Sequence, residues 1–399
     1  MGQTPENELV TVELEEDRYH RLRLIPWWDQ DRLRQARVMV VGAGALGNEI
    51  LKSLALLGIG KIMVLDLDRI EDSNLTRAIL FRHQDQGDYK AEVAARRVCE
   101  VNPDVIVQPV VGDVNYDLGL GVFREMDLVI GALDNREARV TINANCWKLG
   151  VPWIDGAIEL MQGVARVFIP SDEAACYECT MSELDYKLLS QRRSCALLSR
   201  DDVLAGKVPT TPTIASIIGG IQVQEAIKLL HADRGLPVLS GSGFVYNGLT
   251  NDSYVVQYQR RHDCPAHEHM FDISELPRSV TDLTGAEAVQ LARTEVGPQA
   301  VVEFERELCT HLHCPRCQIT TEYFRSLGRV SLAEARCPEC GEIRDPRLTH
   351  CLSGHEDFLE RTLADLGLPL YDIITARQGL TMRRFLLADD RSAAMGAIA

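Results

Sequence analysis

A glycine-rich turn between a strand and a helix constrains the fold of this chain more than any other feature. Residues 40–47 read Val-Val-Gly-Ala-Gly-Ala-Leu-Gly, after a short apolar run at 37–41 and before a helical pattern that ends at Gly58. Such a turn lets the backbone approach a phosphate, and the N-terminus of the helix offers unpaired N–H groups to an anion. Alone, the turn is typical of dinucleotide-binding domains, in which Asp66 after the next strand would bind ribose hydroxyls.

Short apolar segments alternate with helical segments from residue 37 to about residue 170, and this alternation predicts the fold class. It is typical of an α/β fold, a doubly wound and mostly parallel sheet with helices on both faces. The expected strands are residues 37–41, 61–65, 105–111, 127–132, 153–157, 163–170, 237–246 and 253–259. The expected helices are residues 46–57, 136–149 and 213–230, with a long polar loop at 182–207.

A change of composition near residues 263–277 predicts a domain boundary. We expect an N-terminal arm and helix (1–36), the α/β domain (37–274) and a smaller α+β C-terminal domain (275–399). The last domain should contain helices at 285–293 and 356–366, strands at 371–376 and 382–387, and a cysteine-rich ribbon at 311–343.

Composition excludes several classes of protein. The formal net charge of -16 over 399 residues argues against a general affinity for nucleic acid or anionic membranes. The polar, acidic start is not a signal peptide, and no run approaches the roughly 20 apolar residues of a membrane span. We therefore expect a cytoplasmic protein, in which the 12 cysteines serve metal or thiol chemistry rather than disulfides.

Residues suited to a nucleoside triphosphate follow the glycine turn in order. They are Asp66, Asn74, Arg77, Lys90, Asp134 and Asn135. Ligands of a doubly wound sheet lie beyond the carboxyl ends of its strands, so the turn, Asp66 and Asp134 should line one crevice. Arg77 and Lys90 would neutralise phosphate oxygens, and Asp134 suits Mg²⁺. Taken singly, Arg77 and Lys90 could be surface charges, and Asp134 could be the N-cap of a helix. This alternative does not explain why all of these residues occur together in order.

These motifs resemble the superfamily of MoeB, ThiF and the ubiquitin-activating enzymes over roughly residues 18–267. The matching segments are Arg18-Tyr19-His20-Arg21, the turn from Gly42 through Gly44 to Gly47, Leu65-Asp66-Leu67-Asp68, Ser73-Asn74-Leu75-Thr76-Arg77, Lys90, Asp134-Asn135, Cys176-Tyr177-Glu178-Cys179 and Pro209-Thr210-Thr211-Pro212. The resemblance implies a Rossmann-like adenylation domain that binds ATP through these glycines and through the residues near Asp66 and Asp68. It implies that Asp66 binds the ribose, that Asn74, Arg77 and Lys90 contact phosphates, and that Asp134, next to Asn135, holds Mg²⁺. It also implies a homodimer in which Arg21 reaches the ATP of the partner subunit, although Arg21 could equally be an ordinary surface arginine.

Two cysteine pairs far apart in the sequence predict a first structural zinc site. Cys176 and Cys179 form a CxxC motif after a strand, and tetrahedral zinc needs two more ligands. Cys264 and His267 form the remaining pair. The resemblance places a second ligand pair at this point, although two cysteines are commoner there. His262 and His269 are alternatives to His267, and a degenerate site with free thiols is the alternative to zinc.

A second zinc site is predicted from local spacing. Cys314, Cys317, Cys337 and Cys340 form two CxxC motifs with the spacing of a zinc ribbon. Such a module fixes a fold or presents a surface, so we expect a structural role. A redox CxxC is the alternative, disfavoured because two pairs are present.

Cys195 is a candidate nucleophile in the long polar loop. Its neighbours Arg192 and Arg193 would favour the reactive thiolate. In ubiquitin-activating enzymes, the cysteine that forms the thioester lies in or near such a loop, ahead of a motif resembling residues 209–212. An incidental loop cysteine is the alternative.

The resemblance implies a compact activating enzyme for a ubiquitin-like protein. Such an enzyme uses ATP and Mg²⁺ to adenylate the carrier's C-terminal carboxylate, takes the acyl group onto a cysteine, here Cys195, and passes it to a conjugating enzyme. One alternative is a sulfur-carrier adenylyltransferase like MoeB or ThiF, for cofactor or tRNA thiolation. Another is a non-catalytic scaffold subunit of a heterodimeric enzyme, which the retained nucleotide residues disfavour. Similar compact enzymes are predicted in bacterial operons, some linked to antiviral defence, and the C-terminal domain would be the docking surface for a carrier or conjugating enzyme.

Overall fold

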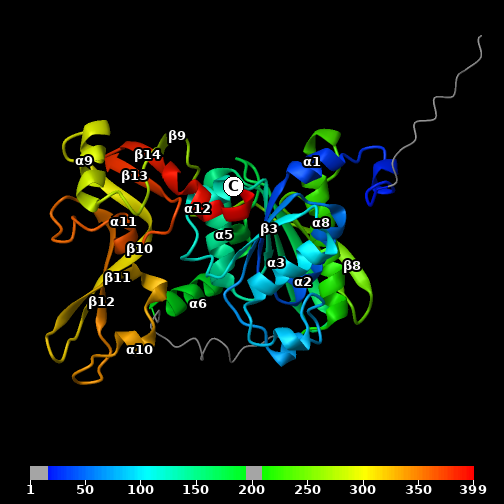
Figure 1. Cartoon of the computed structure of the whole chain (residues 1–399), viewed down its shortest axis with the longest axis horizontal. Coiled ribbons are helices and arrows are strands. Elements are labelled where there is room, and N and C mark those ends of the chain that lie inside the picture. Colours follow the sequence, from blue (N-terminus) through cyan, green and yellow to red (C-terminus); the bar gives the residue numbers. More distant parts are fainter. Residues whose placement is uncertain (1–16, 195–208) are drawn as a thin grey trace, which may run out of the picture.

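The computed structural model describes residues 17–194 and 209–399 and contains two sheets (Figure 1). The first has eight strands in the order β3-β2-β1-β4-β5-β6-β7-β8. They are β1 (Arg37–Val41), β2 (Lys61–Leu65), β3 (Ile106–Val110), β4 (Leu128–Ala132), β5 (Trp153–Glu159), β6 (Gln162–Phe168), β7 (Ser242–Asn247) and β8 (Asp252–Gln257). The first five in spatial order pair in parallel and the rest pair antiparallel, which confirms the predicted α/β, doubly wound, mostly parallel sheet.

Helices cover both faces of this sheet. One face carries α2 (Ala45–Leu57), α3 (Lys90–Val101) and α8 (Pro212–Leu230). The other carries α4 (Leu120–Arg124) and α5 (Arg136–Leu149). After Arg37, strand β1 is apolar because Val38 and Val40 face the first layer, whereas Met39 and Val41 face the second.

The ends of these helices follow from local sequence. Helix α2 stops at Gly58, whose φ of 73° is a left-handed conformation that glycine adopts readily. Helix α8 begins after Thr211, whose side chain accepts a hydrogen bond from the Ile214 N–H, and Pro212 takes the first helical position. The short N-terminal helix α1 (Gln30–Gln35) is capped by Asp29 in the same manner.

The second sheet has six strands and belongs to an α+β domain with a ribbon. Its order is β11-β10-β13-β14-β9, with β12 paired to β10. The elements are β9 (Ile273–Leu276), α9 (Gly285–Glu295), β10 (Val301–His313), β11 (Thr320–Ser326), α10 (Leu332–Ala335), β12 (Asp345–Leu352), α11 (Leu363–Leu366), β13 (Ile373–Gln378), β14 (Thr381–Leu387) and α12 (Arg391–Met395). The long β10 leaves the main sheet and continues between β11 and β12, so that these three strands form the ribbon at the lower left of Figure 1.

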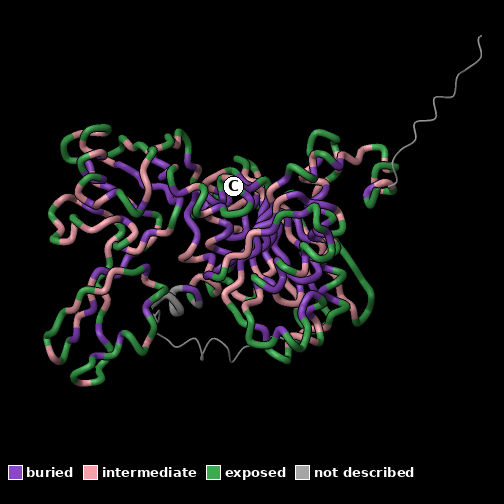
Figure 2. The backbone as a smooth tube through the Cα atoms, in the orientation of Figure 1, coloured by how far each residue is buried: buried purple, intermediate pink, exposed green. Residues whose placement is uncertain are grey.

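One apolar cluster contains residues of both domains, whereas the second sheet and α9 also form a separate core. Tyr371, just before β13, and Ile373 and Leu386 of the second sheet pack in the same cluster as the α5 face of the first. The chain end returns to the first sheet and adds Met395 and Ile398 to this cluster. In Figure 2 the buried backbone is concentrated in the first sheet, whereas the ribbon is mostly exposed or half-buried. The second domain is therefore packed against the first rather than tethered to it.

Two sequence predictions of secondary structure are wrong. The expected loop at 182–207 begins with a helix, α6 (Glu183–Ser194), because Ser182 and Asp185 cap each other reciprocally. The helix expected at 356–366 shrinks to α11, because the carbonyl oxygens of residues 359 and 361 accept hydrogen bonds from the start of α9.

None of the helices within residues 17–194 and 209–399 combines the length and hydropathy that a bilayer crossing requires.

Candidate active site and metal centres

The glycine turn lies at the switch point of the first sheet, where β1 separates β2 from β4. Gly42 has a φ of 97°, and a Cβ there would overlap the carbonyl oxygen of Ala132. A Cβ on Gly47 would overlap the carbonyl oxygen of Gly42, so these two glycines are required for packing. A Cβ on Gly44 would meet no atom within 4 Å. The space beside Gly44, at the N-terminus of α2, is therefore open to a ligand.

Asp66 is fixed against this turn. Its two carboxylate oxygens accept hydrogen bonds from the N–H groups of Ala43 (2.7 Å) and Asp68 (2.8 Å). Burial raises the pKa of Asp66, and the charge of Lys90 with these two N–H groups opposes that rise. Because each carboxylate oxygen has a second lone pair, Asp66 can still accept hydroxyl groups such as those of a ribose.

Lys90 is the fixed cation of the crevice. It begins α3, and its Nζ lies 2.9 Å from a carboxylate oxygen of Asp68. Burial disfavours the ammonium form of Lys90, but the charges of Asp66, Asp68 and Asp134 outweigh it and raise the pKa of Lys90. Lys90 is therefore charged at neutral pH, as phosphate binding requires. The charge of Asp134, which follows β4, contributes to the raised pKa of Lys90 at the start of α3.

Asp134 is an exposed carboxylate of this group. It is exposed after β4, and Asn135 donates to it through its side-chain amide (3.3 Å). Asn135, not Asp134, is the N-cap of α5, since its side chain accepts the Ala138 N–H at 2.9 Å. Asp134 thus retains lone pairs for a cation. The donor set, an exposed carboxylate beside a cationic lysine and an open glycine turn, fits Mg²⁺ with a nucleotide.

Asn74 and Arg77 lie in the segment after β2 and make local contacts. The side chain of Asn74 accepts the Glu71 N–H (3.0 Å), and Arg77 donates to the carbonyl oxygen of Ser73 (2.7 Å). Neither hydrogen bond involves Lys90 or Asp134. Phosphate contacts by Asn74 and Arg77 therefore stay a prediction.

Sequence reasoning missed Asn48, which ties this segment to the glycine turn. Its side-chain amide donates to the carbonyl oxygens of Ala43 (2.7 Å) and Gly44 (3.0 Å) and accepts the Leu80 N–H (2.8 Å). A fully buried asparagine on the apolar face of a predicted helix is the signal that could have identified it.

A buried charge cluster at the ends of β4 and β5 was also missed. Asp155 is fully buried and accepts hydrogen bonds from Arg139 (2.8 Å) and Arg166 (2.8 Å). Burial alone would raise the pKa of Asp155, but the two arginines outweigh it and lower that pKa. Arg139 also donates to the carbonyl oxygens of Leu133 and Gly156. It thereby fixes the strand end that carries Asp134.

Arg21 lies far from the glycine turn of its own chain. The ring of Tyr19, two residues earlier, contacts Gly58 at the C-terminal end of α2. A helix of 13 residues is about 20 Å long, and the turn is at its other end. Exposed Arg21 could therefore serve only the site of another molecule, as the sequence prediction requires.

The first cysteine group forms a four-ligand cluster. The ligand atoms of Cys176, Cys179, Cys264 and His267 all lie within 4.8 Å of one another. The Sγ of Cys176 is 3.6 Å from that of Cys264, and the Sγ of Cys179 is 3.3 Å from Nε2 of His267. Burial lowers the pKa of His267, which keeps its ring neutral, as metal binding requires. Tetrahedral zinc fits this Cys₃His set.

The second cysteine group forms a Cys₄ cluster in the ribbon. The ligand atoms of Cys314, Cys317, Cys337 and Cys340 also lie within 4.8 Å of one another. The two CxxC loops are alike: residues 318 and 341, each four positions after the first cysteine, both have positive φ, and both donate their N–H to that cysteine's carbonyl oxygen. Backbone N–H groups lower the pKa of Cys337 to about 7. This set fits zinc, and pairing of two CxxC motifs favours a ribbon over a redox pair.

Cys195, the predicted nucleophile, lies outside the described residues, as does the remainder of the segment to residue 208. Helix α6 ends at Ser194, the last residue described before Cys195. Arg136, two residues after Asp134, forms an ion pair with Asp185 in the first turn of α6. Tyr186 donates to Glu178 beside the first cysteine cluster (3.1 Å). Helix α6 therefore starts between the predicted Mg²⁺ ligand and the first metal centre.

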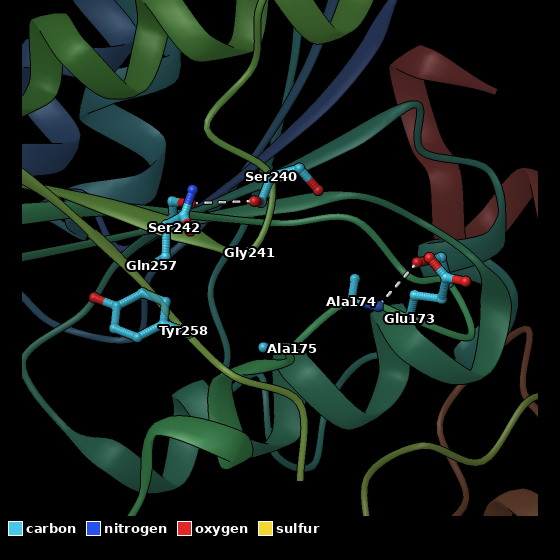
Figure 3. Close-up of a pocket in the computed structure, with 9 residues that line it drawn as sticks. Glu173, Ala174, Ala175, Ser240, Gly241, Ser242, Gln257 and Tyr258 are labelled. Carbon is cyan, nitrogen blue, oxygen red and sulfur yellow. Dashed lines mark hydrogen bonds between the residues drawn. The ribbon is translucent and has the colours of Figure 1, made fainter. Parts of the chain in front are cut away.

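A pocket of about 360 Å³ lies at the opposite edge of the first sheet (Figure 3). It is lined by the loop after β6, the start of β7 and the residues around the end of β8, including Glu173, Ser240 and Tyr258. None of the predicted nucleotide residues lines it. We assign it no part in the candidate active site.

The fold agrees with comparisons to known proteins. The profile of the ThiF family matches residues 17–266, more than half of the chain. This chain belongs to the ThiF family. It is 36% identical over 236 residues to the SAMP-activating enzyme E1 of Haloferax volcanii, covering 59% of this chain and 82% of that relative. It is 33% identical over 256 residues to the sulfur carrier protein adenylyltransferase of Thermus thermophilus, covering 62% and 89%.

Among solved structures, Escherichia coli MccB is similar in fold. The TM-score is 0.53 at 22% identity, over 65% of this ThiF family chain and 75% of MccB. At this identity the likeness concerns the fold alone. The family profile ends at residue 266, so the second sheet and its ribbon lie beyond it.

Proposed function

We propose that this ThiF family chain is an adenylyltransferase that activates the C-terminal carboxylate of a small ubiquitin-like or sulfur-carrier protein with ATP. One observation carries the proposal: the open glycine turn, Asp66, Lys90 and Asp134 meet at the switch point of one sheet. The relatives from Haloferax volcanii and Thermus thermophilus, named as an activating enzyme and a carrier adenylyltransferase, support the same activity.

The reaction joins a carboxylate to AMP. A carboxylate oxygen of the carrier attacks the α-phosphorus, the bond to the β-phosphate oxygen breaks, and pyrophosphate leaves. Asp66 would bind the ribose hydroxyls, and Lys90, with Arg77 and Asn74, would neutralise the phosphate oxygens. Asp134, with Asp68 and Asn135 nearby, would hold Mg²⁺, which would supply further charge neutralisation.

Our preferred second step is thioester formation on Cys195. The thiolate would attack the acyl carbon of the adenylate and release AMP, and the thioester would then pass to a conjugating enzyme. The sulfur-carrier alternative keeps the first step and makes a thiocarboxylate instead of a thioester. The Thermus thermophilus relative supports this alternative, and the Haloferax volcanii relative supports conjugation to a similar degree. A scaffold subunit is disfavoured because Asp66, Lys90 and Asp134 are all retained.

The assay for the first step is ATP–pyrophosphate exchange with candidate ubiquitin-like and sulfur-carrier proteins from the same genome, supplied one at a time. Asp134→Ala should lower exchange by about 100-fold or more, since it removes charge stabilisation at the phosphates. Asp389→Ala, which removes an exposed aspartate of the second domain, is the matched control and should exchange normally. Exchange that survives Asp134→Ala undiminished would contradict the proposed metal site.

The second step and the dimer have separate tests. Cys195→Ala should keep exchange and lose any reductant-sensitive conjugate on a gel, and a conjugate that persists rules Cys195 out. If Arg21 acts in trans, a mixture of inactive Arg21→Ala and Asp134→Ala chains should recover about one quarter of the wild-type exchange, because half of the dimers would hold one complete site. No recovery on mixing would contradict the homodimeric site.

A further inference from the structure

The second domain contacts the edge of the first sheet that holds the candidate active site. The loop at residues 111–118 follows β3 and therefore lies beyond a carboxyl end of the parallel strands. The turn Leu327–Arg329, at the base of the ribbon, packs on this loop: a Cβ on Gly328 would overlap the ring of Tyr116. Beside it, Nε of Arg329 donates to a carboxylate oxygen of Asp117 at 2.8 Å.

A half-buried arginine of β10 holds the backbone of the same loop. Arg306 donates to the carbonyl oxygens of Tyr116 (3.0 Å) and Leu118 (3.2 Å). Its guanidinium also lies 3.1 Å from the carboxylate of Asp372, which is almost fully buried. The position of Tyr116 is therefore set by residues of the second domain, through its ring and through its backbone.

The other side of the loop contacts the first turn of α5. The Tyr116 hydroxyl donates to the carboxylate of Glu137 at 3.2 Å, and the Thr141 hydroxyl donates to the side-chain oxygen of Asn115 at 2.6 Å. Glu137 is the second residue of α5 and lies three positions after Asp134. Tyr116 thus connects Gly328 of the second domain with the helix turn that presents Asp134.

The charges around Glu137 explain why it needs a donor. Burial raises the pKa of Asp113, and the nearby carboxylates of Asp117 and Glu137 raise it further. Carboxylates therefore gather beside the N-terminus of α5, close to the position where Asp134 would bind a cation. Arg329 neutralises Asp117, and the Tyr116 hydroxyl fixes the direction of the Glu137 carboxylate. A released Glu137 would be able to turn toward Asp134 and compete for the cation.

We propose that Tyr116 is a positioning residue for the metal-binding carboxylate Asp134, and that the second domain sets the position of Tyr116 through Gly328 and Arg306. This inference rests on the proposed function, because it takes Asp134 as the Mg²⁺ ligand. It gives the second domain a role in adenylation itself. The contacts that carry it come from residues 306–329, outside the region that the ThiF family profile matches.

The test compares ATP binding with and without Mg²⁺. Tyr116→Phe keeps the ring against Gly328 and removes only the hydroxyl, whereas Gly328→Ala displaces the ring. By titration calorimetry on the full chain, both variants should bind MgATP about 3- to 10-fold more weakly, the effect of one hydrogen bond. Their affinity for ATP in EDTA should stay within about twofold of wild type, since only the metal-dependent part is affected.

Gly220→Ala is the matched control, because a Cβ there meets no atom within 4 Å, and it should change neither affinity. Tyr116→Phe remains informative if Gly328→Ala does not fold. If Tyr116→Phe lowers the melting temperature but leaves the ratio of MgATP to ATP affinities unchanged, Tyr116 is merely structural and the inference is wrong. If the wild-type chain itself binds no MgATP, the proposed function fails, and the inference loses its basis with it.

Discussion

The two cysteine clusters use similar ligands in opposite ways. The first joins a segment before α6 to a segment after β8, since Cys176 and Cys264 are 88 positions apart. The second closes a local ribbon, in which Cys314 and Cys340 are 26 positions apart. A metal that connects distant segments restrains much more of the unfolded chain than one that closes a short loop.

Their surroundings differ as much as their spacing. The first cluster is part of a core: the ring of Trp147 on α5 lies 4.8 Å from that of His267, and the Tyr177 N–H donates to the buried side chain of Asn143. The second lies on the ribbon, which is mostly exposed or half-buried, although each cluster combines two buried with two half-buried ligands. We infer that the first metal holds the adenylation domain together, whereas the second shapes one extension of the other domain.

The largest expected effect separates the two clusters by stability. Cys176→Ala should cost more than about 4 kcal/mol, as expected for a lost metal in a buried site, and lower the melting temperature by roughly 10 °C or more. Cys314→Ala should leave the main calorimetric transition within about 2 °C of wild type, because only the ribbon loses its metal. Equal losses in the two variants would contradict the distinction.

Chelation should separate the clusters by rate. We expect two zinc ions per chain, and the cluster in the mostly exposed or half-buried ribbon should release its ion to a chelator first. After this first release and removal of the chelator, MgATP affinity should stay within about twofold of wild type, because the adenylation domain keeps its own metal. A zinc-sensitive dye follows the release, and Cys317→Ser is the control that should lack the fast phase. If the fast phase persists in Cys317→Ser, the fast-released zinc does not come from the ribbon cluster, and the expected order of release is wrong.

The smallest expected effect concerns the helix that starts beside the first cluster. Arg136→Gln removes the ion pair with Asp185. Because the side chain of Arg136 is 48% exposed and that of Asp185 is 21% exposed, the free energy of unfolding should fall by only about 0.2–1 kcal/mol. Amide hydrogen exchange in the first turns of α6 should nevertheless accelerate. Arg278→Gln, which breaks comparable pairs in the second domain, should leave that exchange unchanged. Unchanged exchange in Arg136→Gln would show that the Ser182–Asp185 cap suffices.

The first sheet and the ribbon cluster could be predicted because their signals are local, whereas the pairing of the first cluster came from the one remaining Cys-x-x-His pair and the family resemblance. Strand β1 is a continuous apolar run, the glycines stand at a strand-to-helix turn, and CxxC spacing is readable directly. Helix α6 also had a local signal, Ser182-x-x-Asp185, which its polar composition obscured.

Features that depend on tertiary contacts could not be predicted. The pattern around Phe358 and Leu363 has helical periodicity, but hydrogen bonds to α9 draw the backbone out of a helix before Thr362 caps α11. The cluster around Asp155 needs arginines from α5 and β6, and Tyr116 meets Gly328 across 212 positions of sequence. No sequence motif brings such partners together.

Because one apolar cluster contains residues of both domains, the part of the chain that folds together is larger than the part that the family profile matches. A fragment cut at residue 266 would lack His267 and would leave the α5 face without Tyr371, Ile373 and Leu386. Such a fragment would expose an apolar surface and would also contain an incomplete metal site. We therefore expect the adenylation domain to need the second domain in order to fold, and a chain that lost it to aggregate before its chemistry could be measured.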